Sequence, residues 1–489
     1  MLFELCLEPD SAVRLTRLPS VARGRSRPQR QRTIWYDSPD RRLAEAGLAL
    51  SEEKGSWRLE RLCPGLEDWP PACPAPVLAE APDASLLGIG LPANLAPAAA
   101  CEGHVSEQVL ETEHGPVTLK RLRGLIRTVA TERPVARVSL SGEEGAVLAA
   151  ARAVGDAAQA WVPRASLAAE AFAAADSTPP AARRLGAPTL PGNGSICEGF
   201  SHALGHLTDV ILHHAPRAAA PDSPPEPIHQ MRVAVRRLRS TITVFRDVFP
   251  AEPMSLAASS LRALAQALGP AREWDVFMTE TAPAVSAVLP DDARLARLLN
   301  AARRKREEAH ATLGAYLESP EFRRLGIELA WLAGARSWHS NSLPYTDAPA
   351  NPPVLAQPLS AFAAASLQRR LKKLRTAGEN IEELDIPALH GLRLRAKRMR
   401  YAAEIMAPLF PPKPTRRFID RLSLLQARLG FLNDGAVAAS LMEQLGGPGG
   451  RHGYAVGLVL GFTAAGTSSM RSRIVQAWEK FLRQPPFWA

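Results

Sequence analysis

Residues 228–245 read IHQMRVAVRRLRSTITVF, and this stretch decides the fold of the C-terminal part of the chain. Apolar side chains recur every three or four residues, the spacing that gathers them on one face of an α-helix. The predicted packing face consists of Met231, Val235, Leu238, Ile242 and Phe245. The opposite face carries His229, Arg232, Arg236 and Arg239, with Arg237 to one side. The stretch therefore predicts a helix with one buried face and one row of cations.

The same pattern returns in residues 389–401, LHGLRLRAKRMRY, at a constant offset of 161 residues. The equivalent cationic positions are His390, Arg393, Lys397, Arg398 and Arg400. Further along, the offset relates Leu268-Gly269 to Leu429-Gly430 and Arg272-Glu273 to Asn433-Asp434. A register held over about 45 residues indicates a duplicated helical unit.

The two basic stretches contain almost no acidic residues. Neither the segment from His229 to Phe245 nor the one from His390 to Tyr401 contains an Asp or Glu. A helix face that is charged only for solubility usually mixes signs, because opposite charges one turn apart attract. Like charges at that spacing repel each other, unless an external polyanion neutralises them. Polyanion binding is therefore favoured over a solvated surface.

Three further groups have less specific roles. His229 and His390 are open between two roles, as neutral residues that donate a hydrogen bond inside a packed helix or as direct phosphate contacts. Lys373, in the basic run RRLKK, is a candidate extension of the binding surface. Asp275 and the Asn433-Asp434 pair are interpreted as residues that orient arginines or cap helices.

The chain divides into an α+β part and an all-α part. Residues 1–176 contain strand-like runs, residues 177–194 form a linker rich in proline and glycine, and residues 195–489 are helical. Within the helical part we expect two related halves, 195–339 and 359–489. The expected strands are Met1–Glu8, Gln31–Asp37, Gly55–Leu62, Pro116–Leu122, Gly124–Val129 and Val135–Leu140. The expected helices include Met254–Leu268, Ala293–Leu317, Leu359–Ala377, Arg416–Leu429, Asp434–Leu445 and Tyr454–Leu482.

Composition restricts the compartment and the partners. The 489 residues carry a formal net charge of +10, which favours polyanionic partners. The five cysteines form no C-x-x-C pair, which fits a reducing cytoplasm and argues against a zinc site. No secretory signal precedes the first strand, and no apolar run is long enough to span a bilayer. We expect a cytoplasmic protein that does not bind membranes.

Several kinds of phosphate site are missing from the sequence. The basic helices lack interleaved aromatic residues that would stack on bases, and no series of Asn or Gln lines up to read base edges. No P-loop motif is present. Basic helices without side chains that recognise bases favour inorganic polyphosphate over nucleic acid as the ligand.

The repeated H-x-x-R-x-x-x-[RK]-R-x-R motif and the segment LQARLGFLND at residues 425–434 resemble the CHAD family, the conserved-histidine α-helical domains. The resemblance implies a duplicated helical bundle and a polyphosphate ligand held by basic residues. A location at polyphosphate granules is compatible with such a ligand.

A second resemblance concerns residues 1–176. The segment Tyr36–Leu50 is similar to the Y-F-D-T-P-D-x-x-L-x-x-x-G-x-x-L segment of CYTH domains, and Val135–Ala149 is similar to their late strand and helix. The resemblance implies a closed antiparallel barrel whose tunnel binds triphosphate or polyphosphate together with a divalent metal.

The chemistry of that family is largely absent from this chain. The opening E-x-E-x-K motif keeps only Glu4, and the late acidic strand carries Arg137 and Ser139 instead of carboxylates. In the S-K-x-x-R helix motif, the lysine and the arginine are replaced by Leu167 and Glu170. A tunnel that hydrolyses triphosphate needs clustered carboxylates for the metal and clustered cations for the phosphates. The sequence therefore predicts a degenerate domain that is not catalytic, without metal or other cofactor.

Two alternatives stay open. The first is a metal-dependent triphosphatase or polyphosphatase that uses the remaining barrel carboxylates Glu4, Glu52, Glu53 and Glu60, with Mg²⁺ or Mn²⁺ as its cofactor. The second is a nucleic-acid binder, or an adaptor that brings partners to polyphosphate granules.

Overall fold

The computed structural model describes residues 1–18, 27–68, 94–182, 184–249, 251–335, 354–465 and 470–488. These residues form two compact units that interleave along the chain. Unit 1 contains a β-sheet with its helices, the middle of helix α5 and helix α10; unit 2 contains the other helices. The two units are not contiguous along the chain, so they do not test the expected domains 1–176 and 195–489 with the linker 177–194. That division stays a prediction.

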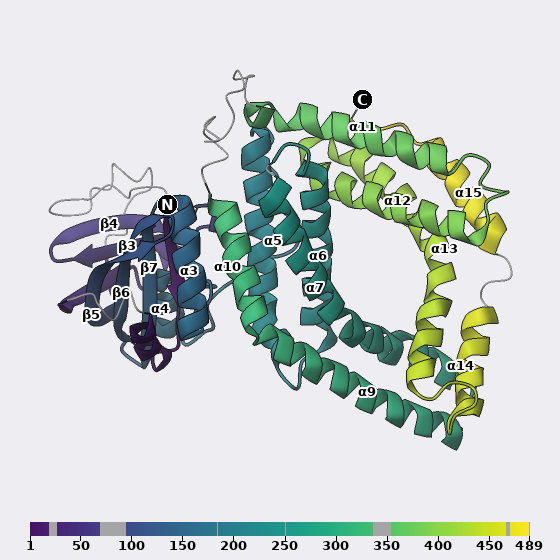
Figure 1. Cartoon of the computed structure of the whole chain (residues 1–489), viewed down its shortest axis with the longest axis horizontal. Helices are drawn as coiled ribbons and strands as arrows, with labels where there is room; N and C mark the ends of the chain where they lie inside the picture. The colour runs from purple at the N-terminus through teal and green to yellow at the C-terminus, as the bar shows by residue number, and fades with distance from the viewer. Residues whose placement is uncertain are drawn as a thin grey trace. The chain divides into compact units, whose positions relative to one another are not determined.

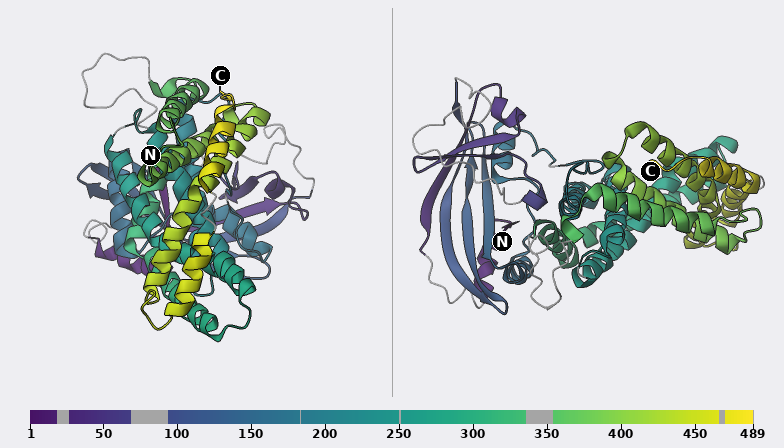
Figure 2. Two further views of the ribbon diagram at one scale, coloured as in Figure 1. Left: turned by 90° about the vertical axis from the view of Figure 1, so that its right-hand side faces the viewer. Right: turned by 90° about the horizontal axis from the view of Figure 1, so that it is seen from above.

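Unit 1 is built on one seven-stranded antiparallel sheet (Figures 1 and 2). Its order is β1-β7-β6-β5-β2-β3-β4, so β1 and β4 are its two edges. No described residue pairs these two edges, so the described sheet is a curled half-barrel, and the expected closed barrel is not formed by these residues. The strands are β1 (Leu2–Cys6), β2 (Gln29–Asp37), β3 (Leu48–Glu53), β4 (Ser56–Arg61), β5 (Ala96–Thr112), β6 (Gly115–Arg127) and β7 (Glu132–Gly142).

Helices cover the two faces of the sheet. The helical segments of unit 1 are η1 (Ser11–Arg17), α2 (Arg42–Glu45), η2 (Leu66–Asp68), α3 (Glu144–Ala158), α4 (Leu167–Ala175) and α10 (Pro320–Gly334). The alanine-rich α4 begins at Ser166, whose hydroxyl accepts the Ala169 N–H at 3.0 Å. Its Phe172 packs with Trp35 and Ile126 in the core of the sheet. Helix α3 packs against β1, β5, β6 and β7.

Unit 2 is all helical, as expected. Its helices, with α5 shared between the units, are α5 (Ile196–Ala219), α6 (Pro225–Phe245), α7 (Ala251–Val276), the π-helical η4 (Phe277–Thr281), α8 (Ala282–Val288), α9 (Ala293–Leu317), η5 (Val354–Ala356), α11 (Leu359–Ala377), α12 (Ile386–Met406), η6 (Ala407–Leu409), α13 (Pro412–Gln444), α14 (Gly453–Ala465) and α15 (Met470–Leu482). The starts of α6 and α12 are 161 residues apart, as are their ends, and α7 and α13 begin at the same offset. The duplication expected from the sequence is therefore present in the helix boundaries.

The helices of unit 2 contact one another in a closed circuit. Helix α6 packs on α7, α7 on α9, α9 on α14, α14 on α13, α13 on α12, and α12 returns to α6 (Figure 1). Phe245 at the end of α6 contacts Phe200 of α5 at 5.4 Å and Phe362 of α11 at 5.0 Å between ring centroids. These aromatic contacts join the first repeat to the first helix of the second.

Three element boundaries differ from the sequence predictions. Helix α13 is continuous, whereas two helices separated near Gly430 were expected. A glycine inside a helix lowers its stability by only about 1 kcal/mol, and packing of α13 against α12, α14 and α15 offsets this cost. Strand β6 likewise continues through Gly124, where a Cβ would lie 2.4 Å from the Glu102 carbonyl oxygen. The expected helix Tyr454–Leu482 is two helices, α14 and α15.

No described helix is both long enough and apolar enough to cross a membrane. No disulfide joins any two of the four cysteines in the described part of the chain.

Candidate functional site

The site is organised by the contact between α6 and α12, one basic helix from each repeat. The predicted packing face of α6 is buried: Met231, Val235, Leu238, Ile242 and Phe245 are each at most 3% exposed. On α12 the buried face includes Leu392, Ala396 and Met399. Because these apolar faces fix both helices in the core, their cationic faces can meet.

Five cations from both repeats lie close together, and we call them the inter-repeat cluster: Arg232, Arg236, Arg393, Lys397 and Arg400. The positive charges of the other four members all lower the pKa of Lys397. Burial, followed by the positive charges of Arg393, Arg236, Arg232 and Arg400, lowers the pKa of Lys397 from 10.5 to about 8. The charges that lower the pKa of Lys397 are positive, whereas carboxylates act on two other members of the cluster, Glu273 on Arg232 and Glu404 on Arg400. The inter-repeat cluster therefore holds like charges together that are only partly balanced.

Tyr401 lies between two arginines of the inter-repeat cluster. The guanidinium carbon of Arg236 is 4.7 Å from the centre of its ring, and that of Arg400 is 5.0 Å away. Cations at such distances are attracted by the negative faces of aromatic rings. Arg400 is held further by its Nε, which donates to Gln426 Oε1 at 2.7 Å, and by its Nη1, 2.8 Å from Glu404 Oε1. Tyr401 thus links the basic helices of the two repeats.

Two donors of the inter-repeat cluster are buried without an acceptor. The Nε atoms of Arg236 and Arg393 have no hydrogen-bond partner among the described residues. Arg393 is only 9% exposed. An unpaired buried donor is costly, and a charged one more so. These two groups are therefore suited to an acceptor that comes from outside the chain.

Two further basic residues of α6, His229 and Arg237, lie near charged members of the inter-repeat cluster. Burial lowers the pKa of His229, aided by the nearby charges of Arg272 and Arg236 and opposed by Glu226 and Glu280. Burial also lowers the pKa of Arg237, which Glu404 opposes, while Arg236 and Arg400 add to the decrease. Sequence reasoning did not include Arg272 and Tyr401 in the site. The repeat register contained Arg272, and the second basic segment ended on Tyr401.

The structure does not bring every predicted residue to the inter-repeat cluster. The predicted residues that are exposed and have no described interaction with the cluster are Arg239, His390, Arg398 and Lys373. Position 239 lies nearly one turn beyond Arg236 on α6. As ligand contacts these four residues stay predictions. The side chains of Asn433 and Asp434 lie outside the described residues.

Asp275 orients an arginine, as the sequence suggested. Its carboxylate is fully buried, and Oδ1 accepts from Arg306 Nε at 2.6 Å and lies 2.9 Å from His310 Nε2. Burial would raise the pKa of Asp275, but these two hydrogen bonds and charges lower it. This ion-paired group joins α7 to α9 and lies outside the inter-repeat cluster.

Comparison with known families identifies the region that contains the two basic helices and their 161-residue offset. The family model for the CHAD domain matches residues 202–443. Residues 202–443 are a CHAD domain. The match contains α6 and α12 and therefore every member of the inter-repeat cluster.

Two relatives extend this comparison. The crystal structure of the CHAD domain from the plant Ricinus communis is 25% identical in sequence, with a TM-score of 0.51, and covers 62% of this chain and 98% of that one. An uncharacterized protein of Mycobacterium tuberculosis, Rv2226 in strain H37Rv and MT2285 in strain CDC 1551, is 31% identical over 233 residues. That match covers 45% of this chain and 42% of the relative, so the chain spans less than half the length of the curated proteins it matches.

Outside the CHAD domain, the interior of the unit 1 sheet pairs its charges internally. Arg137 is 2% exposed; its Nη2 is 2.9 Å from Glu170 Oε1 and its Nη1 is 3.6 Å from Glu4 Oε1. Both carboxylates thus face a fixed cation. Glu53 accepts from Gln31 Nε2 at 2.9 Å, and Glu52 accepts from the backbone of Gly55 at 2.6 Å. Among the described residues, no group of three or more His, Cys, Asp or Glu side chains is placed to hold a metal ion.

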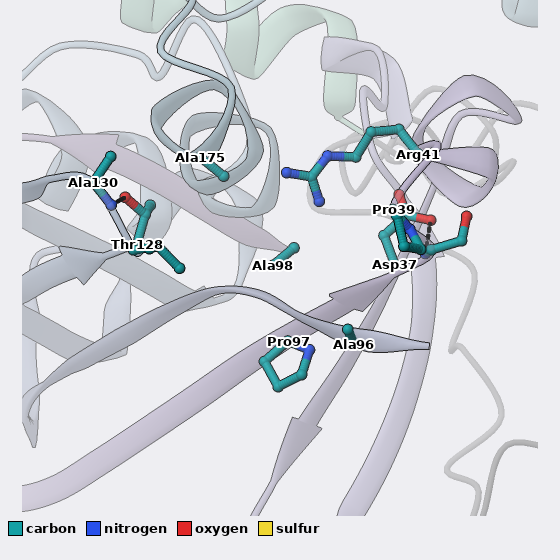
Figure 3. A pocket seen from close by; sticks show the side chains of 11 residues that line it. Asp37, Pro39, Arg41, Ala96, Pro97, Ala98, Thr128, Ala130 and Ala175 are labelled. Carbon is teal, nitrogen blue, oxygen red and sulfur yellow. Dashed lines mark hydrogen bonds between the residues drawn. The ribbon is translucent and has the colours of Figure 1, made fainter. Parts of the chain in front are cut away.

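Unit 1 also contains a cavity of about 310 Å³ beside Asp37 and Arg41 (Figure 3). Its charged lining is already engaged. Asp37 accepts the backbone N–H groups of Ser38, Leu43 and Ala44 at 2.8 to 3.1 Å. The Nε and Nη2 atoms of Arg41 both donate to Asp176. The Tyr36–Leu50 segment therefore builds a turn here, and the other residues that line the cavity are small and largely apolar.

Proposed function

We propose that the CHAD domain binds inorganic polyphosphate at the inter-repeat cluster and does not act on it chemically. The observation that carries the proposal is the junction of Lys397 and Arg393 from one repeat with Arg232 and Arg236 from the other. Cations gathered in this way, which outnumber the carboxylates Glu273 and Glu404 that act on them, are suited to a repeating anion. Family membership supports the same ligand class.

The binding energy would come from many phosphate contacts of one kind. Guanidinium groups can donate two parallel hydrogen bonds to phosphate oxygens, and the free Nε atoms of Arg236 and Arg393 supply such donors. A long anionic chain also releases condensed counterions when cations replace them. Affinity is therefore expected to increase with polymer length and to fall steeply with salt.

For unit 1 we propose a CYTH-like origin with loss of catalysis. Its half-barrel sheet fits the resemblance in fold class, and Arg137 occupies the interior beside Glu4. An arginine at this position opposes the binding of a divalent cation. We also propose a cytoplasmic location, with association to polyphosphate granules following from the ligand.

The test is a titration of long-chain polyphosphate against the intact protein, with duplex DNA as competitor at matched phosphate concentration. The proposal predicts tight binding that DNA does not displace, and stronger binding of long chains than of short ones. Ready displacement by DNA would indicate a general basic surface. Release of phosphate with Mg²⁺ or Mn²⁺, abolished by chelation, would instead support the enzyme alternative.

A further inference from the structure

One face of the unit 1 sheet carries an exposed row of cations. Strand register places Arg30 of β2 directly opposite His104 of β5, and His104 opposite Arg123 of β6. Directly paired residues on neighbouring strands point to the same face. All three side chains are exposed, and none has an ion-pair partner in the described part of the chain. Neighbouring strands are about 5 Å apart, so the row spans about 10 Å.

The row is not neutralised by its surroundings. Glu102 lies on the same face and is shared by two other arginines, Arg32 at 2.9 Å and Arg127 at 2.9 Å. Arg30 and Arg123 lie two strands apart with His104 between them, so both guanidinium groups can contact one external anionic chain.

Aromatic side chains lie on the same face. Arg30, Arg32 and Tyr36 alternate with inward residues along β2, a run of about 20 Å, and Trp35 points the other way into the core with α4. The ring of Tyr36 is 4.8 Å from that of Trp57 on β4, and both rings are half-buried. The two rings are tilted at 48° to each other and lie on the same face as the basic row.

This part of the face is open. On this face of β6, Leu119 is fully buried at the end of the strand where α3 packs, whereas Arg123 is exposed. Helix α4 lies on the opposite face, where Phe172 packs with Trp35. In the CHAD domain the ring of Tyr401 is buried and already contacts Arg236 and Arg400. The rings of Tyr36 and Trp57 on this sheet are partly exposed.

We propose that this face binds single-stranded nucleic acid, with phosphates along Arg30, His104 and Arg123 and a base stacked on Trp57. An open antiparallel sheet with basic and aromatic side chains provides both contacts that single strands need, backbone neutralisation and base stacking. Polyphosphate has no bases, so Trp57 would contribute nothing to its binding. The proposal is independent of the function proposed for the inter-repeat cluster.

The experiment measures the affinity of the full chain for a labelled single-stranded RNA of roughly 12 nucleotides. It is done with Arg236→Ala and Arg393→Ala also present, so that the inter-repeat cluster contributes little. Adding Arg30→Ala and Arg123→Ala is expected to lower RNA affinity by about tenfold, because two phosphate contacts are lost. The matched control is Lys120→Ala with Arg133→Ala, exposed cations whose register places them on the opposite face. An equal loss in both variants would overturn the proposal.

Two further variants separate stacking from charge. Trp57→Leu is expected to weaken RNA binding roughly tenfold, and Trp57→Phe to retain most of it. In the otherwise wild-type chain, Arg30→Ala with Arg123→Ala should leave polyphosphate affinity unchanged. If polyphosphate affinity falls with RNA affinity, or if Trp57→Leu has no effect on RNA, the face is a general anion surface and the proposal is wrong. Circular dichroism establishes that each variant is folded.

Discussion

Arg137 in unit 1 and Arg236 in unit 2 show two ways of keeping a cation inside a protein. Arg137 lies between Glu4 and Glu170, so its charge is neutralised within the fold. Arg236 lies on the Tyr401 ring among other cations. The Nε atoms of both arginines are buried without an acceptor in the described part of the chain, so the two carboxylates beside Arg137 are what distinguishes them. The first arrangement stabilises a domain by itself. The second is poised for an anion that the chain does not supply.

The largest effect is expected from breaking the first arrangement. Arg137→Met removes the cation and leaves two carboxylates facing each other, which should lower the free energy of unfolding by about 3–5 kcal/mol. The measurement is urea denaturation followed by circular dichroism. The matched control is Arg324→Met, whose pair with Asp156 at 2.8 Å is exposed and should contribute under about 1 kcal/mol. Equal losses from the two variants would show that burial does not distinguish these pairs.

The second prediction introduces the unit 1 arrangement into unit 2. Arg236→Glu places a carboxylate beside Arg393 and Lys397, so polyphosphate affinity should fall by about a hundredfold, since one charged contact is lost and repulsion is added. The melting temperature should rise, because the like charges gain a partner. A lower melting temperature would show that the like charges of the inter-repeat cluster do not destabilise the fold. Unchanged polyphosphate affinity would show that the cluster is not the polyphosphate-binding site.

The third prediction uses the pKa of Lys397, which burial and its neighbours lower to about 8. Bound phosphate favours the charged amine, so affinity should decrease as the pH rises through 8, about tenfold between pH 7 and pH 9. The free energy of unfolding changes with pH in the opposite direction to the affinity. The folded pKa lies below 10.5, so the unfolded chain binds more protons between pH 8 and 10.5, and stability rises across that window.

Lys397→Arg is the control for this pH dependence, because a guanidinium stays charged throughout the range. Binding measured by isothermal calorimetry from pH 7 to 9 should be nearly flat in this variant. The same slope in both proteins would assign the titration to another group.

The smallest effect concerns Tyr401, which orients Arg236 and Arg400 without being charged itself. Tyr401→Leu should weaken polyphosphate binding about threefold, as expected when one or two cation–π contacts are lost. Tyr401→Phe keeps the ring and should bind like the wild type. A loss in the phenylalanine variant would move the contribution from the ring to the hydroxyl.

Much of the helical fold could be predicted from local sequence. The apolar spacing of Met231, Val235 and Leu238 predicted the buried face of α6, and the offset of 161 residues predicted its repeat as α12. Helices α9 and α11 have the predicted boundaries. No part of strand β5 was predicted; its start at Ala96–Ala100 is alanine-rich and has no strand-like alternation.

The site was only partly predictable, because periodicity assigns a residue to a helix face but not to a neighbour. Arg232, Arg236, Arg393 and Lys397 meet because α6 crosses α12 at their level. His390 belongs to the same helical face and is nevertheless exposed. In unit 1, the sequence showed Arg137 where the CYTH resemblance implies a carboxylate, but its pairing with Glu4 required the register of β1 with β7.

The most direct test of the inter-repeat cluster is the salt dependence of polyphosphate binding. It compares the wild type, the variant Arg236→Ala with Arg393→Ala, and the control Arg416→Ala with Arg417→Ala, which removes two exposed cations of α13. The inter-repeat cluster variant should bind far more weakly, and the slope of log affinity against log salt should decrease by about two, one for each lost phosphate contact. The control should keep the affinity and slope of the wild type. Equal changes in both variants would contradict the account, because binding would then depend on total charge and not on the junction of the two repeats.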